Sequence, residues 1–438
     1  MKIFRLLLAT LLSIFLIGCG NTGVNSPSDA NREETNEEII VENNKKEIDI
    51  QVVEENESIK SESLNFPVET NPPETNYLPH FEGQTRVNGL KTVTEYSFQE
   101  FAKGLNSPWG ISVLPEGDFV ITEKGGSLRI LSTNGEISEG IGGLPEVDSR
   151  GQGGLLDVKV APDFSENRIL YFTFSEPSSE GNLTAVGRGM LSDDKRMLEN
   201  FEVIFRALPY YKSSGHYGSR IAIDREGNLF ISTGDRMEFE NRMRAQELDN
   251  GHGKILHITS DGKSVIGGPF EDKGEMASKI YSYGHRNVQG LDIHPESGEL
   301  WASEMGPRGG DELNLILPGK NYGWPIISYG IEYSGAEVEE GITEKDTMEQ
   351  PVYYWDPVLA PSGMIFYHSD EIPEWKNNLF IGGLRSQHIA RIVIEDGKVV
   401  GEERLLSNLG ERFRDLEVGI DGALYAITDG GTVYRIGK

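Results

Sequence analysis

Four segments of the chain combine glycine with arginine, asparagine, glutamine or histidine, and these side chains can bind anions or move protons. Glycine lets the backbone approach a ligand closely, and a guanidinium group pairs with a carboxylate through two parallel hydrogen bonds. The segments therefore predict a site for an anionic ligand, if the fold brings them together. They are Arg150–Asp157, Gly215–Arg220 with Gly234–Arg236, Gly284–Gly290 with Glu304–Asn314, and Glu411–Asp415.

Two pairs within these segments suggest specific chemistry. His216 is the candidate general base, because a neutral imidazole accepts a proton near pH 7. Asp235 is the candidate partner that orients this ring. Arg412 and Arg414 alternate, so on a strand their side chains face the same side and are expected to share a target.

The elements that must position these residues repeat along the chain. In each copy an alternating apolar strand leads through a turn to a second apolar strand, which ends in a small or acidic residue. Period-two alternation between turn signals predicts strands, and each copy has room for four of them. The sequence predicts an all-β fold, a six-bladed β-propeller, with a pair of β-sandwiches or a seven-bladed ring as alternatives. The copies begin at Trp109, Leu155, Ser219, Gln289, Gly363 and Asp415.

The start of the sequence is typical of an export signal. Lys2 and Arg5 precede the apolar run Leu6–Ile17, which is too short to span a bilayer. Leu-Ile-Gly-Cys resembles the lipobox of bacterial lipoproteins, so residues 1–18 are expected to be a lipoprotein signal peptide and Cys19 the lipidated residue. An ordinary signal peptide is the alternative. The resemblance implies an exported protein, attached by its lipid to the outer face of the bacterial cell membrane.

Composition divides the rest of the chain. Between residues 20 and 80 there are 14 acidic and 4 basic residues, with much Asn, Ser, Thr and Pro. Such a segment buries little apolar surface, so residues 19–87 are expected to be a disordered acidic linker and residues 88–438 the propeller domain. The net charge of −29 excludes nucleic acid as a partner and requires a local basic cluster for any anionic ligand.

The four segments, in this order, closely resemble the soluble PQQ-dependent aldose dehydrogenases of the glucose/sorbosone dehydrogenase family. Gly-His-Arg-Asn-X-Gln-Gly from Gly284 and Glu-X-Gly-Pro-Arg-Gly-Gly-Asp-Glu-Leu-Asn from Glu304 are specific in combination. The resemblance extends from Phe101 to Ile436. It implies a six-bladed propeller that holds pyrroloquinoline quinone (PQQ) and calcium, in agreement with the repeats. His216 matches the family's catalytic histidine.

PQQ is a planar o-quinone with three carboxylates, and arginines are natural partners for carboxylates. Arg385 falls where some relatives have lysine, so its contact is less certain. The resemblance assigns PQQ contacts to Gln152, Arg286, Asn287, Gln289, Arg412 and Arg414.

A calcium ion would make the quinone more electrophilic, and calcium accepts backbone carbonyls as ligands. The resemblance assigns such carbonyls to Gly306 and Pro307. A second, structural calcium is suggested at Glu312 with the carbonyl of Tyr322, although Glu312 could equally cap a turn. Tyr354 and Trp355 are expected either to form walls for the sugar or to be core between blades.

The main hypothesis is therefore oxidation of an aldose sugar at its anomeric hydroxyl to the lactone. No Cys-X-X-Cys-His haem motif is present, so the electrons must pass to an external acceptor. The protein is expected to be a monomer. A calcium-dependent lactonase, which needs converging acidic ligands, and a non-catalytic binding propeller at the cell surface are the rival hypotheses.

Overall fold

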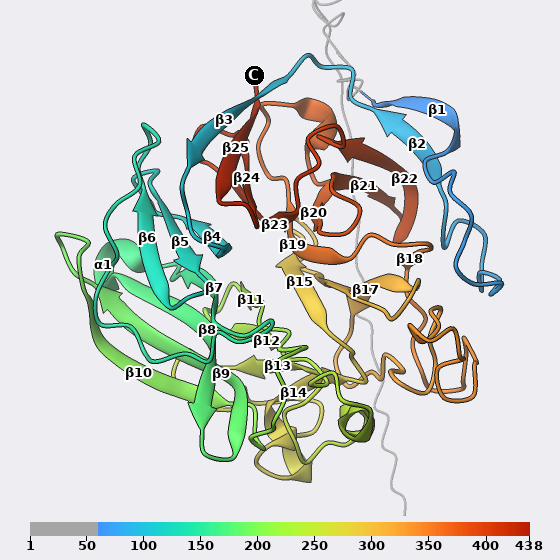
Figure 1. Cartoon of the computed structure of the whole chain (residues 1–438), viewed down its shortest axis with the longest axis horizontal. Helices are drawn as coiled ribbons and strands as arrows, with labels where there is room; N and C mark the ends of the chain where they lie inside the picture. The colour runs from blue at the N-terminus through green and yellow to red at the C-terminus, as the bar shows by residue number, and fades with distance from the viewer. Residues whose placement is uncertain (1–59) are drawn as a thin grey trace, which may run out of the picture. The chain divides into compact units, whose positions relative to one another are not determined.

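The computed structural model describes residues 60–438 and arranges its strands as six sheets around a central channel (Figure 1). The prediction of a six-bladed β-propeller is confirmed. The expected signal peptide, Cys19 and the linker before Lys60 lie outside the described residues. Within residues 60–438, no helix is long and apolar enough to cross a membrane.

Each blade runs from an innermost strand at the channel to an outer edge. The first three blades are β4 (Pro108–Val113), β5 (Phe119–Glu123) and β6 (Ser127–Leu131); β7 (Leu155–Val160), β8 (Ile169–Ser178), β9 (Gly181–Leu191) and β10 (Leu198–Arg206); and β11 (Ile221–Ile223), β12 (Leu229–Ser232), β13 (Lys254–Ile258) and β14 (Ile280–Tyr283).

The fourth and fifth blades are β15 (Val288–Ile293), β16 (Leu300–Glu304), β17 (Asp311–Ile316) and β18 (Tyr353–Trp355); and β19 (Pro361–Phe366), β20 (Leu379–Gly383), β21 (Ile389–Glu395) and β22 (Lys398–Leu405). The sixth blade joins β23 (Phe413–Val418), β24 (Leu424–Thr428) and β25 (Thr432–Gly437) to β3 (Ser97–Lys103). Because β3 pairs with β25, strands from both ends of the propeller close the ring.

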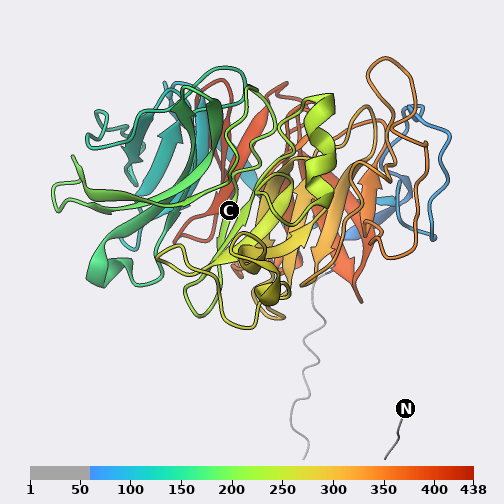
Figure 2. The ribbon, with the colours of Figure 1, turned by 90° about the horizontal axis from the view of Figure 1, so that it is seen from below.

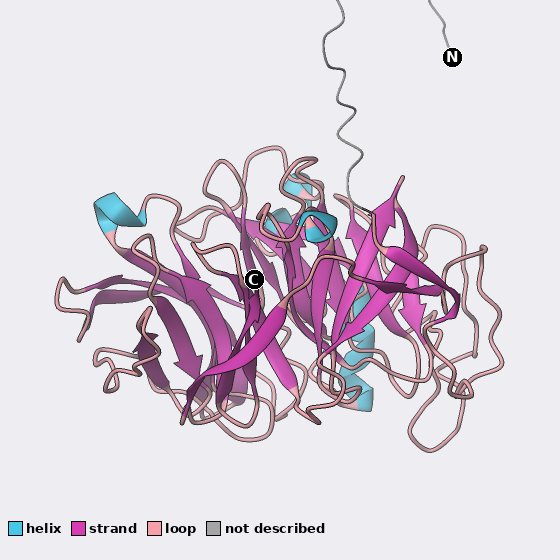
Figure 3. Ribbon diagram, turned by 90° about the horizontal axis from the view of Figure 1, so that it is seen from above, coloured by secondary structure: helices cyan, strands magenta, loops and turns pink. Residues whose placement is uncertain are grey.

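Short helices mark the two faces of the disc (Figures 2 and 3). The 3-10 helix η1 (Phe239–Gln246) protrudes from one face. α1 (Phe164–Asn167), η2 (Glu271–Lys273) and η3 (Ala277–Lys279) lie on the opposite face. A further 3-10 turn, η4 (Pro373–Trp375), precedes β20.

The core consists of a separate apolar cluster between each pair of neighbouring blades. Val120 of β5 packs toward the second blade, whereas Phe119 and Ile121 of the same strand pack toward the sixth. Both faces of such a strand are therefore buried, which explains why the central strands are nearly continuous apolar runs.

Aspartates on the innermost strands of alternate blades also join neighbouring blades. Asp157 of the second blade accepts a hydrogen bond from the backbone N–H of Ile221 in the third, at 2.8 Å. Asp292 of the fourth blade accepts one from Phe366 in the fifth, at 2.7 Å. Asp415 of the sixth accepts one from Ile111 in the first, at 3.0 Å. We call these three residues the channel aspartates.

The linker prediction is wrong for residues 60–87, which pack against the fourth and fifth blades. We call residues 60–91 the N-terminal arm; its strands are β1 (Glu62–Pro67) and β2 (Asn88–Lys91), and β2 pairs with β22 (Figure 1). Gln84 is fully buried and donates to the Pro351 carbonyl at 2.9 Å. Thr75 donates its hydroxyl to Asp356 at 2.8 Å. Polar pairing with the fourth and fifth blades orders this segment, together with the burial of Val87 in the apolar cluster between them.

Candidate active site

A pocket of about 350 Å³ lies where the innermost strands of several blades begin, at one mouth of the channel. Its volume is in the range of small-molecule sites. Trp109, Tyr217 and Met305 supply apolar surface. The polar side chains that line it come from the first, second, fourth and sixth blades and the loops before them: Lys124, Gln152, Asn287, Gln289, Arg412 and Arg414. Five of these six were predicted from the sequence, and Lys124 was not.

His216 adjoins this pocket and is paired with Asp235. The Nδ1 atom of His216 lies 2.6 Å from Oδ1 of Asp235, and both side chains are buried. The Gln152 side chain accepts a hydrogen bond from the His216 backbone N–H at 2.8 Å. His216 has a φ of 46°, a conformation that L-residues seldom adopt and that surrounding contacts must hold. The expected pairing of base and acidic partner is thus present.

Burial and charge determine the protonation of this pair. Burial lowers the pKa of His216 from its ordinary value, and the Arg286 guanidinium lowers it further, whereas Asp235 opposes the shift. Burial would raise the pKa of Asp235, but His216 and Arg286 outweigh it and lower that pKa. An ionised Asp235 accepts the proton on Nδ1, which leaves Nε2 as the basic nitrogen of a neutral ring.

The amide residues of the Gly-His-Arg-Asn segment hold the histidine loop. Asn287 accepts a hydrogen bond from the Gly218 N–H at 3.1 Å, and Gln289 donates to the Gly218 carbonyl at 2.8 Å. Gly218 has a φ of 64°, and a Cβ there would lie 2.6 Å from the Thr233 backbone, so only glycine fits. His285 pairs with Glu304 at 3.0 Å and has a supporting role.

Arg412 and Arg414 converge on a common carboxylate of the chain itself, whereas the shared target expected from the sequence was the cofactor. The carboxylate of Asp429 receives the Nε–H groups of both arginines, each at 2.8 Å. Burial would raise the pKa of Asp429, but Arg414 and Arg412 lower it. Asp429 was missed because it follows β24, and only the hairpin pairing brings it beside β23. The pocket thus presents two oriented arginines and Lys124.

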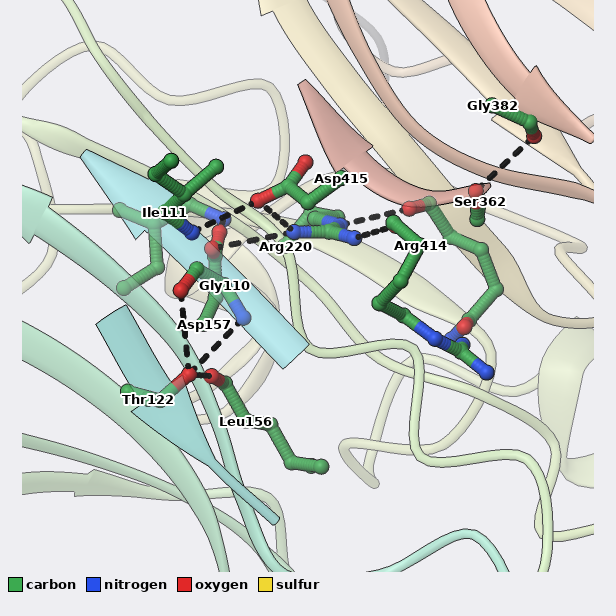
Figure 4. A network of polar contacts seen from close by, with 12 residues as sticks. Gly110, Ile111, Thr122, Leu156, Asp157, Arg220, Ser362, Gly382, Arg414 and Asp415 are labelled. Atoms are coloured by element: carbon green, nitrogen blue, oxygen red, sulfur yellow. Dashed lines mark hydrogen bonds and ion pairs between the residues drawn. The ribbon is translucent and has the colours of Figure 1, made fainter. Parts of the chain in front are cut away.

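Arg220 is the centre of a buried polar network that includes Asp157, Asp415 and the backbone of Arg414 (Figure 4). Its guanidinium pairs with Asp415 at 2.8 Å and Asp157 at 3.1 Å. It also donates to the carbonyls of Gln289, at 2.7 Å, and Arg414, at 3.0 Å, so one side chain fixes the backbone of two pocket-lining residues. The sequence segment contained Arg220 but gave no signal for this role.

Arg286 and Arg385 do not line the pocket. Arg286 donates to the carbonyls of Met305 at 2.9 Å and Gly306 at 2.6 Å. Arg385 is exposed beside the pocket residue Leu384. The sequence prediction of a cofactor contact is therefore better supported for Arg412 and Arg414 than for these two arginines.

The loop predicted to bind calcium already holds a cationic group, since carbonyls of Met305 and Gly306 converge on Arg286. Asp311 shapes this loop by accepting the Gly306 N–H at 2.9 Å. Burial raises the pKa of Asp311 to about 6. Pro307 follows in the same buried turn. Among residues 60–438, no three His, Cys, Asp or Glu side chains converge in a metal-binding cluster, so a metal here would depend on carbonyl oxygens.

The residues suggested for a second calcium are both connected to Glu304, Glu312 through Asn314 and Tyr322 through His285. Asn314 donates to Glu304 at 3.2 Å and to Glu312 at 3.1 Å. Burial and the neighbouring Glu304 raise the pKa of Glu312 well above its ordinary value. The ring of Tyr322 stacks on His285, with 4.7 Å between the ring centroids. A second calcium at Glu312 stays a prediction.

Of the two alternatives for Tyr354 and Trp355, the structure supports core and not walls of the sugar site. Trp355 is buried in the apolar cluster between the fourth and fifth blades and donates its indole N–H to Glu402 at 3.0 Å. Tyr354 stacks on Tyr329, with 4.1 Å between centroids. Both residues lie in β18, at the outer edge of the fourth blade, so they are core residues.

Comparison with known proteins places these features in one family. The sequence profile described as Glucose / Sorbosone dehydrogenase matches residues 105–435. The aldose sugar dehydrogenase YliI of Escherichia coli is 41% identical over 328 residues, covering 74% of this chain and 88% of that protein. A crystal structure of glucose dehydrogenase is 43% identical with a TM-score of 0.75, covering 78% of this chain and 99% of that one.

The PQQ-bound form of the aldose sugar dehydrogenase of Streptomyces coelicolor is also similar, with a TM-score of 0.65 at 28% identity, covering 79% of this chain and 99% of that chain. The profile match spans the first five blades and most of the sixth, and it includes the pocket, the His216–Asp235 pair and the arginine pair. The chain belongs to the glucose/sorbosone dehydrogenase family.

Proposed function

We propose that this chain is a PQQ-dependent dehydrogenase that oxidises aldose sugars at the anomeric hydroxyl to the lactone. One observation carries the proposal: a buried His216–Asp235 pair adjoins a pocket lined by Lys124, Arg412 and Arg414. A base beside a cationic pocket suits a reaction that removes a proton from a sugar while an anionic cofactor accepts a hydride.

The donor set fits PQQ. Three cationic side chains and the amides of Gln152, Asn287 and Gln289 line a cavity of about 350 Å³, and the planar, tricarboxylate quinone requires such partners. Lys124, Arg412 and Arg414 would hold the carboxylates, and the quinone supplies a two-electron acceptor for the hydride from C1. The backbone carbonyls of Gly306 and Pro307 would be ligands for calcium. The Gly306 oxygen would become available when the hydrogen bond that it accepts from Arg286 is broken.

The protein residues divide the remaining work. The Nε2 atom of His216 accepts the proton of the anomeric hydroxyl as the C1–O double bond forms. Asp235 stabilises the imidazolium that results, and Gln152 fixes the backbone of the histidine. Arg220 keeps the backbone of Gln289 and Arg414 in place. The electrons then pass to an external acceptor.

The test is reconstitution of purified apoprotein. Dye reduction with several aldoses should require both PQQ and calcium, and each omission is a control. His216→Ala should abolish turnover while PQQ still binds. Lactone hydrolysis without PQQ would instead support a lactonase, and sugar binding without dye reduction would support a non-catalytic propeller.

We also propose that the enzyme is a monomer attached to the outer face of the bacterial membrane through a lipid on Cys19. The motif at residues 16–19 and the single cysteine support the lipid anchor. Metabolic labelling with a radioactive fatty acid should mark the parent protein but not Cys19→Ser. Label retained by the variant would exclude this anchor.

A further inference from the structure

Asp235 accepts hydrogen bonds at both carboxylate oxygens, and one of its partners comes from the neighbouring fourth blade. The indole Nε1–H of Trp324 donates to Oδ2 of Asp235 at 2.7 Å. Trp324 lies in the Asn321–Pro325 segment between β17 and β18 of the fourth blade, whereas Asp235 follows β12 of the third. The proposed reaction uses Asp235 but has so far given Trp324 no role.

The three donors to Asp235 fix the plane of its carboxylate. Oδ1 faces Nδ1 of His216 at 2.6 Å and accepts the backbone N–H of Met237 at 2.8 Å. With Trp324 on Oδ2, neither oxygen is free to rotate away from the histidine. Nε2 of His216 makes no hydrogen bond to any residue in the described range 60–438, so it is the nitrogen available to a substrate.

Trp324 is itself held rigidly. Its backbone N–H donates to the Gly284 carbonyl at 2.8 Å, and its carbonyl accepts from Gln246 at 2.7 Å. The Arg286 guanidinium carbon lies 5.1 Å from the centroid of its ring. Gly284 and Arg286 belong to the Gly-His-Arg-Asn segment, so Trp324 contacts both the histidine–aspartate pair and the segment that flanks the pocket.

We propose that Trp324 is a positioning residue for the catalytic base. Its N–H keeps Asp235 oriented so that the carboxylate accepts the Nδ1–H hydrogen bond of His216, which leaves Nε2 for the substrate. This inference rests on the proposed function, because it assumes that His216 is the base. It concerns the indole N–H alone, not the packing of the ring.

The charged groups around His216 determine the effect of removing this N–H. Asp235 and Arg236 come from the loop after β12, and Arg286 comes from the segment before β15. Arg242 of η1 lies 5.3 Å from the Trp324 ring centroid. Without the indole donor, the negative charge of Asp235 acts more fully on the imidazolium, so the pKa of His216 should rise.

Trp324→Phe removes the donor and keeps an aromatic ring. In the PQQ-loaded enzyme we expect kcat to fall about tenfold, comparable to one hydrogen bond to a charged group, with KM unchanged. The acidic limb of kcat/KM should move to higher pH. Trp375→Phe is the matched control, because Trp375 is a buried tryptophan that donates to Thr92 at 2.7 Å, between the fifth and sixth blades. It should keep the kcat and the pH profile of the parent.

Nitrogen-15 NMR of the histidines tests the inference without turnover. In the apoprotein, His216 of the parent should carry its proton on Nδ1, and Trp324→Phe should raise its pKa. A His216 pKa that is unchanged in Trp324→Phe, with a kcat within twofold of the parent, would overturn the role of Trp324. A parent that binds PQQ yet oxidises no aldose would instead refute the proposed function.

Discussion

At the scale of single residues, the histidine that we propose as the general base combines an uncommon backbone conformation with a lowered pKa. His216 has a φ of 46°, and Gln152 and Asp235 hold its backbone and its ring. Strain at such a position is tolerated when the surrounding contacts over-determine it. The lowered basicity keeps the ring neutral, which is the state that accepts a proton.

The pH dependence of turnover follows from this environment. Burial and Arg286 lower the pKa of His216, so the base stays neutral to lower pH than a free histidine, which titrates at about 6.5. We expect kcat/KM to be constant above about pH 6.5 and to decline only below it. Dye reduction by the loaded enzyme across this range checks the profile. A decline that begins well above pH 7 would contradict the assignment of the base.

The arginine pair should control cofactor affinity. Arg414→Ala removes a charge-assisted contact worth about 1.5–3 kcal/mol, so the Kd for PQQ should rise at least about tenfold. Titration of the apoprotein with PQQ measures it. Arg435→Ala is the control, since Arg435 pairs with Asp421 at the same 2.8 Å in the same blade but outside the pocket. Equal Kd values for PQQ in the two variants would show that Arg414 does not contact the cofactor.

At the scale of elements, the channel aspartates join the blades in pairs. Each accepts a backbone N–H from the innermost strand of the next blade, and the accepting residues lie on the second, fourth and sixth blades. Apolar clusters fill the space between all neighbouring blades. The aspartates therefore add directional contacts that fix how the inner strands are aligned.

Loss of one such contact should lower stability by a predictable amount. Asp292→Ala leaves the Phe366 N–H without its acceptor, a change that costs about 1–3 kcal/mol. We expect a lower Tm in calorimetry with little change in PQQ affinity, because Asp292 does not line the pocket. Glu395→Ala, at an exposed position of β21, should leave the Tm unchanged. Equal Tm values for the two variants would refute this contribution.

At the scale of the whole molecule, the N-terminal arm is part of the folded unit. Arg404 pairs with Glu69 at 2.8 Å, and Arg86 donates to the Asp356 carbonyl at 2.8 Å. These contacts join the arm to the fifth blade and to the segment after β18. The arm thus covers the outer edges of two blades that would otherwise be exposed.

Truncation tests this role. A chain that begins at Asn88 should be less stable than one that begins at Lys60, by roughly 3 kcal/mol or more, because several buried hydrogen bonds of about 1 kcal/mol each are lost. Denaturant unfolding of the two truncated proteins measures the difference. Identical midpoints would show that the arm adds no stability.

Sequence patterns predicted the fold and most of the pocket, because alternation and turns repeat and because the motifs lie at the starts of inner strands. They failed where the structure depends on contacts between distant segments. The arm has the composition of a disordered linker, yet Gln84 and Thr75 find partners on the blades. Trp355 lies on a strand with both faces buried, and Asp429 reaches Arg414 only through a hairpin. None of these contacts leaves a local signal.

The closure of the ring by β3 has a consequence for when the protein can bind a ligand. During synthesis, β3 has no strand to pair with until β25 has been made, because β25 is its hydrogen-bonding partner in the sixth blade. Arg414 belongs to that same late sheet, whereas Lys124 and Gln152 belong to blades made early. A chain that has not yet been synthesised as far as β23 therefore lacks the Arg412–Arg414 side of the pocket. A ligand that needs these arginines can bind only after the sixth blade has formed.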